Sequence, residues 1–89
     1  MLINHSYSEY NSCARLHNGF IRDPDHPLKP LRSTLTNADV PGFPATITVL
    51  TAMTGAQIDP ILAAFGLATD GMVSERRQRL RFYIGLPKL

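Results

Sequence analysis

The sequence predicts a small, mainly α-helical protein in which an irregular, proline-rich N-terminal extension, residues 1–43, packs on a domain of three short helices, residues 44–89. Five of the seven prolines fall within residues 24–44, and each removes an amide donor and biases the preceding residue away from helix. Helical apolar spacing and helix-ending glycines follow that segment. Because 89 residues provide material for only one core, the extension must share it.

The extension allows one short helix ahead of the prolines, near Ser8 to Leu16. In that helix Tyr10, Cys13 and Leu16 would share a face. Residues 18–44 are expected to form loop and extended segments, because the prolines recur too closely for a helix to continue between them.

The first helix of the domain is predicted in the stretch PATITVLTAMTG. Pro44 suits a first helical turn, Ile47 and Leu50 keep helical spacing, and Gly55 is a common residue just past a helix end. A strand is the alternative, since residues 46–49 are mostly β-branched and alternate in polarity.

The second helix is predicted from one apolar stripe that ends at Gly66. The stripe consists of Ile58, Ile61, Leu62 and Phe65. Asp59 and Pro60 form an N-cap and first-turn pair, whereas Thr54 and Gln57 offer a rival capping box. We favour the start at Asp59, because the earlier start would place Pro60 inside the helix at a cost of about 3 kcal/mol.

The third helix should begin near Thr69 or Asp70 and run through GMVSERRQRLRFY. Val73, Leu80 and Ile84 keep spacings of seven and four and are expected to face the core. The alternation of apolar residues after residue 81 also permits a strand at the end.

Charge is distributed unevenly along the chain, whose net charge is +2. Residues 1–70 carry four basic against six acidic side chains, whereas residues 71–89 carry five basic against one acidic. Four arginines fall within residues 76–81. A patch of one sign concentrates oppositely charged partners, so nucleic acid or an acidic protein is expected, unless the arginines form an ordinary solvated helix face.

The order of the helix-ending residues along the chain resembles that of a known class of protein. Thr54-Gly55 closes the first helix, Phe65-Gly66-Leu67 closes the second, and the third carries Val73-Ser74 and Arg76 and closes at Gly85-Leu86. Residues 47–86 thereby resemble the winged-helix and helix-turn-helix regulators of bacteria and their phages. The connection GLATDG is about one residue longer than the usual one, and Pro60 is unusual in a positioning helix. The few residues after 86 lead us to expect a wing that is absent or supplied by the N-terminal segment.

The resemblance implies a helix-turn-helix-like fold that binds double-stranded DNA as a homodimer. We expect a transcriptional regulator or recombination accessory factor of phage or plasmid type. On the third helix, Ser74, Arg77, Gln78 and Arg81 would face outward toward base edges. Arg76 and Arg79 would flank that face and neutralise phosphates. Arg77→Ala with Arg81→Ala should then abolish DNA binding without lowering thermal stability.

Two further functions are compatible with the same residues. One is a small protein-binding inhibitor or anti-host factor that uses the basic surface, together with exposed Met72, Phe82 and Tyr83, against an acidic protein. The other is a structural subunit that assembles through residues 58–66. Neither involves enzymatic activity, and we expect no catalytic residues and no cofactor.

The cysteine and histidine content points to no specific chemistry. Cys13 is the single cysteine, so no internal disulfide can form, and the polar N-terminus lacks a secretory signal, which fits the cytoplasm. Cys13 and His17 have the spacing of two ligands on one helical turn, and with His5 and His26 they offer a zinc site or a Cys-His nucleophile pair. We expect a buried thiol, surface histidines and no metal. No apolar run reaches the length of a membrane span.

Overall fold

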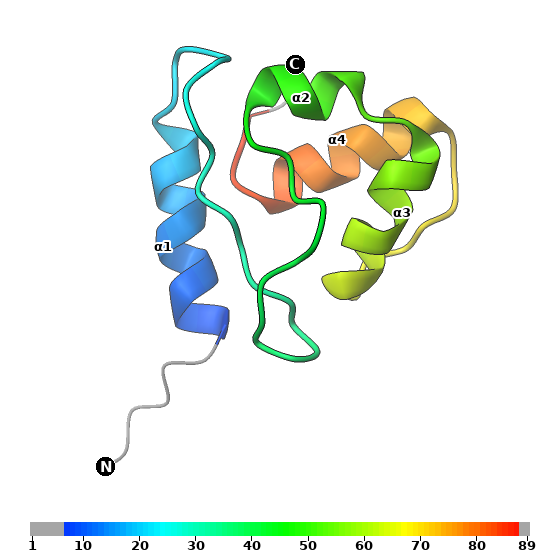
Figure 1. The fold of residues 1–89 in the computed structure, drawn as a ribbon, viewed down its shortest axis with the longest axis horizontal. Helices are drawn as coiled ribbons and strands as arrows, with labels where there is room; N and C mark the ends of the chain where they lie inside the picture. Colours follow the sequence, from blue (N-terminus) through cyan, green and yellow to red (C-terminus); the bar gives the residue numbers. More distant parts are fainter. Residues whose placement is uncertain (1–6, 88–89) are drawn as a thin grey trace.

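The structure, a computed structural model, describes residues 7–87. Within this range the chain forms four helices: α1 (Tyr7–Gly19), α2 (Ile47–Ala52), α3 (Gly55–Ala64) and α4 (Val73–Tyr83). Figure 1 shows α1 on one side, the long connection in the middle and the other three helices gathered on the far side. The prediction of a mainly helical domain is confirmed. In the described part of the connection, residues 20–46, strand pairing is limited to an isolated bridge between Arg32 and Asp39.

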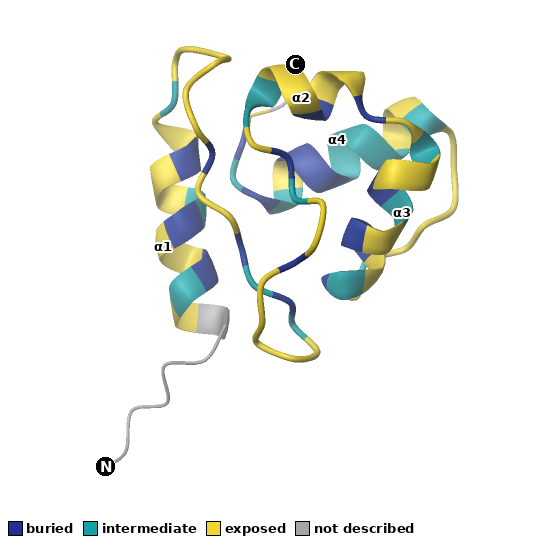
Figure 2. Ribbon diagram, viewed as in Figure 1, coloured by how far each residue is buried: buried dark blue, intermediate teal, exposed yellow. Residues whose placement is uncertain are grey.

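One hydrophobic core draws on both parts of the chain. Figure 2 shows buried positions along α1 and the connection as well as on α3 and α4. Residues before position 44 therefore share one core with the helices that follow. The buried apolar residues are Ala14, Leu28, Leu31, Val40, Leu50, Met53, Ile58, Ile61, Leu62, Phe65, Leu80, Ile84 and Leu86.

Helix α1 is longer than predicted and buries a different face. We expected Cys13 and Leu16 to lie on the inner face, but Cys13 is exposed and Leu16 is 69% exposed. The buried positions are instead Asn11, Ala14 and Asn18, at spacings of three and four. The two asparagines of this face hydrogen-bond to backbone groups, whereas Ala14 between them packs in the apolar core.

Two asparagine side chains hold α1 against the connection. Asn18 accepts from the Lys29 amide at 2.7 Å and donates to the carbonyls of Lys29 and Ile84 at 3.1 and 2.8 Å. Asn11 accepts from the Arg32 amide at 2.6 Å and donates to the Arg32 carbonyl at 2.9 Å. The amides thus satisfy backbone groups of Lys29 and Arg32, in a segment whose strand pairing is limited to the bridge between Arg32 and Asp39.

The predicted start of α3 is wrong. The helix begins at Gly55 with the capping box, in which the Gln57 amide donates to the Thr54 hydroxyl and the Gln57 side chain accepts from the Thr54 amide. Pro60 therefore lies inside the helix. Two capping bonds offset part of the cost of this proline, and both Pro60 and Ala56, four residues earlier, are exposed. Water can therefore hydrate the carbonyl group left without an amide partner.

Helix α2 begins after Thr46, whose hydroxyl accepts from the Val49 amide at 3.1 Å, and the strand alternative for this segment is wrong. Only Met53 and Thr54 separate α2 from α3. Gly55, expected just past the end of α2, is the first residue of α3.

Helix α4 begins at Val73, three to four residues later than predicted, with the Glu75 carboxylate accepting from the Met72 amide at 2.8 Å. Leu80 and Ile84 are fully buried, as predicted. No strand follows α4 up to residue 87, because Gly85 at φ 104° turns the chain back and the Leu86 amide donates to the Arg81 carbonyl at 3.0 Å.

Candidate functional site

The site is built on one face of α4. Ser74, Arg77, Gln78 and Arg81 occupy positions i, i+3, i+4 and i+7, and the structure brings all four to the wall of one surface hollow of about 180 Å³. Thr51 of α2 completes the wall, and it was not singled out in the sequence because its place depends on how α2 packs on α4. Ser74 and Thr51 are exposed, so the hollow opens to solvent between them.

Arg81 does not face outward as we predicted. It is only 5% exposed, and its Nη2 donates to the Pro87 carbonyl at 3.0 Å. The Gly85 turn causes this burial, because it folds residues 86–87 back along the end of α4. Within the described part of the chain, Arg81 Nε and Nη1 have no hydrogen-bond acceptor. Loss of water around the guanidinium lowers the pKa of Arg81.

Arg77 joins α4 to the end of α2. Its Nη2 donates to the Met53 carbonyl at 2.7 Å, at the C-terminal end of α2 where a positive charge is favourable. Arg77 Nε and Gln78 Oε1 are buried and find no partner among residues 7–87. Side chains that line the hollow therefore carry several buried polar atoms whose hydrogen-bonding capacity is unused.

Arg76 and Arg79 connect α4 to its neighbours rather than standing free beside the face. Arg76 Nη1 lies 2.6 Å from an oxygen of Asp59 on α3, and the Arg76 side chain is only 16% exposed. Arg79 Nη1 donates to the carbonyls of Ala68 and Asp70 at 2.7 and 2.9 Å, with the Asp70 carboxylate at 3.8 Å. Of the two arginines that we expected to flank the face and neutralise phosphates, Arg76 thus pairs with a carboxylate, whereas the Arg79 side chain keeps 30% exposure. Their contact with phosphate stays a prediction.

The connection from α3 to α4 comprises residues 65–72, which is longer than the three or four residues of a compact helix-turn-helix turn. Gly66 at φ 70° ends α3, as predicted, and Gly71 at φ 97° precedes α4. Arg79 braces this loop through its two carbonyl contacts. Between residues 7 and 87 there is no two-stranded wing, since β-pairing is limited to the isolated bridge in the connection.

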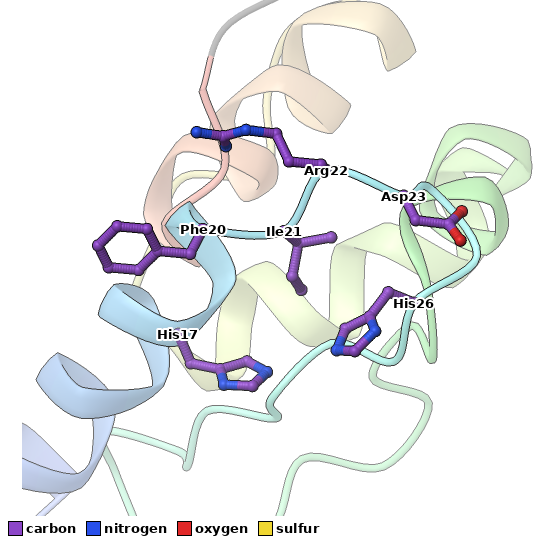
Figure 3. Close-up of a pocket in the computed structure, with 6 residues that line it drawn as sticks. All are labelled: His17, Phe20, Ile21, Arg22, Asp23 and His26. Carbon is purple, nitrogen blue, oxygen red and sulfur yellow. The ribbon is translucent and has the colours of Figure 1, made fainter.

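The histidines and the cysteine do not form a metal centre in the described part of the chain. Figure 3 shows His17 of α1 and His26 of the connection turned toward the same space, with ring centroids 6.0 Å apart. The Asp23 carboxylate points away from both rings. No group of three His, Cys, Asp or Glu side chains in residues 7–87 is placed to hold a metal ion. His5 lies outside the described residues.

None of the helices that the structure describes has both the length and the apolar character needed to cross a membrane. Comparison with protein families, with curated proteins and with solved structures finds no match for this chain. The functional proposal therefore depends on the geometry of α4 and its neighbours.

Proposed function

We propose that the protein is a small double-stranded-DNA-binding protein, a transcriptional regulator or recombination accessory factor of phage or plasmid type, which meets DNA with α4. The observation that supports this most directly is the composition of the hollow on α4. Two guanidinium groups, two hydroxyls and one amide line it, and no Asp or Glu stands among the described residues of its wall. A positive surface without neighbouring carboxylates attracts the phosphate backbone of any duplex.

The way the arginines are held favours contact with phosphates over the reading of bases. Arg76, Arg77 and Arg79 each already donate to an acceptor of the protein, so none extends freely as a guanine contact would require. Positive charge and the remaining donors still suffice for phosphate contacts, which carry little sequence information. We therefore propose binding with weak sequence preference, by two protomers together, because a helix of 11 residues covers few base pairs.

A fluorescence anisotropy titration with a short random-sequence duplex at two salt concentrations tests this function. We expect binding at low micromolar protein that weakens as salt increases, because each phosphate contact contributes about 0.9 to the slope of log affinity against log salt. Arg77→Gln should lower this slope by about one. Lys29→Gln removes the same charge from an exposed side chain beside α1 and should leave the slope unchanged. Folded protein that shows no salt-dependent binding would refute the proposal.

One observation favours an acidic protein as the second candidate partner. Met72, just before α4, and Phe82, near its end, are 69% and 68% exposed, whereas Tyr83 is half-buried with its ring centroid 4.9 Å from that of Phe65. Exposed apolar side chains beside positive charge suit a protein interface better than a phosphate backbone. This alternative predicts no duplex binding in the titration, and a loss of partner binding in Phe82→Ser.

A further inference from the structure

The unused hydrogen-bonding capacity of the hollow indicates what it binds. Arg81 is 95% buried and lines the hollow, yet its Nε and Nη1 donate to nothing among the described residues, and neither does Arg77 Nε. A buried donor without an acceptor is costly, and a charged one more so. A ligand that accepts from these groups would recover that cost, so the hollow favours an anion.

We propose that this hollow, formed by Thr51, Ser74, Arg77, Gln78 and Arg81, is a binding site for one phosphate group. That the phosphate belongs to a DNA backbone rests on the proposed function, whereas the site itself does not. Its volume of about 180 Å³ lies below the range of about 300–1,000 Å³ typical of pockets for larger ligands, which fits a single anionic group.

The number of donors favours phosphate over carboxylate. Two guanidinium groups and the hydroxyl of Ser74 are available at the hollow, whereas the Thr51 hydroxyl already donates to the Ile47 carbonyl at 2.9 Å. Half a turn of the Gln78 amide exchanges its unpaired oxygen for the NH₂ group and adds a further donor. A carboxylate has two oxygens to meet these donors, whereas a phosphate group presents three or four around a tetrahedral centre.

Binding requires a small movement of Arg81. Its Nε and Nη1 are shielded from solvent by neighbouring atoms, so the guanidinium must turn toward the hollow before an oxygen can reach them. The hydrogen bond of its Nη2 to the Pro87 carbonyl marks the end of α4 as the part that adjusts. We therefore expect phosphate to shift the amide signals of residues 84–86 as well as those of the hollow.

The test is an NMR titration with inorganic phosphate at constant ionic strength, followed on the arginine Nε–H signals. We expect the Arg77 and Arg81 signals to shift with a common saturation curve. Arg79 Nε–H serves as the internal control, because Arg79 lies outside the wall of the hollow. Phosphate at ten times its Kd should also raise Tm by about 6 °C or more.

Substitutions at Ser74 make the test specific. Ser74→Asp places a carboxylate at the mouth of the hollow and should abolish the phosphate shift. Ser74→Ala removes one hydrogen bond to a charged group, so it should raise Kd by about tenfold or more without abolishing the shift. Lys29→Gln changes net charge by the same amount as Ser74→Asp and should leave phosphate binding intact. Arginine signals that do not move in wild-type protein, or a response that survives Ser74→Asp, would overturn the site.

The source of the phosphate is settled by adding duplex DNA. Competition between duplex and inorganic phosphate, lost in Ser74→Asp, supports a backbone phosphate as the natural ligand. Phosphate binding without duplex binding supports the proposed phosphate site, with free phosphate or a small phosphorylated molecule as its ligand. The same result refutes the proposed DNA-binding function. Duplex binding that changes neither with added phosphate nor in Ser74→Asp refutes the hollow as a phosphate site. It does not contradict the proposed DNA-binding function.

Discussion

Replacing Arg81 by methionine should leave the protein as stable as before or more stable. Methionine keeps an unbranched side chain over the core while removing a guanidinium that is 5% exposed and has two unpaired nitrogens. The lost bond to the Pro87 carbonyl costs about 1.5–3 kcal/mol, and relief of each unpaired buried N–H returns about 1–3 kcal/mol. We therefore expect the free energy of unfolding of Arg81→Met to lie within about 1 kcal/mol of the wild-type value, or above it.

Urea denaturation followed by circular dichroism in phosphate-free buffer measures this difference. Arg81→Ala also removes the packed stem, so it should be about 2–5 kcal/mol less stable than Arg81→Met. The double variant Arg77→Ala with Arg81→Ala should therefore lower thermal stability, which is the opposite of the prediction from sequence. Arg79→Met is the matched control, because Arg79 donates two carbonyl bonds, and it should lose about 1–3 kcal/mol. A loss above about 3 kcal/mol in Arg81→Met would refute the reasoning, since it would mean that the buried guanidinium is well paired.

Two further predictions concern the fold. Asn18→Ala should lower the free energy of unfolding by about 2–4 kcal/mol and Tm by about 10 °C or more, because it leaves buried backbone groups of Lys29 and Ile84 without partners. Thermal denaturation measures this change, and an unchanged Tm would contradict the role of Asn18 in holding α1 against the connection. Pro60→Ala should stabilise the protein by about 1–3 kcal/mol, because it restores an amide donor to the Ala56 carbonyl. Urea denaturation measures the free energy of unfolding, and an unchanged value would show that the helix accommodates Pro60 at no cost.

The parts of the fold that sequence reasoning found are those that local periodicity determines. The apolar stripe of α3, the glycine that ends it and the inward positions Leu80 and Ile84 of α4 follow from helical spacing alone, and the structure buries them as expected. The start of α3 was mistaken because the cost of Pro60 was weighed without the two hydrogen bonds of the capping box. Proline does disfavour the helix interior, but its cost at position 60 does not outweigh the capping box at the earlier start.

The parts that sequence reasoning missed depend on partners far away in the chain. Asn11 and Asn18 lie on one face of α1, seven residues apart, but their role depends on the backbone at Lys29 and Arg32. Their spacing on one helix face was the available signal, and it is weak because asparagine is usually exposed. Thr51 likewise enters the hollow only because α2 packs on α4.

The charge pattern shows why a cluster of arginines in a sequence is an incomplete guide to a binding surface. Arg76 and Arg79 bind carboxylate and carbonyl groups of α3 and of the following loop, so their charge mainly serves the fold. Arg76 Nε is also buried without a partner among residues 7–87, but Arg76 does not line the hollow. Arg77 and Arg81 each make one bond and retain unpaired donors in side chains that do line it. A purely structural role for Arg81 would be met as well by methionine. A buried charge that the fold does not fully pair is therefore best explained by a ligand, and the phosphate titration decides whether that ligand is an oxyanion.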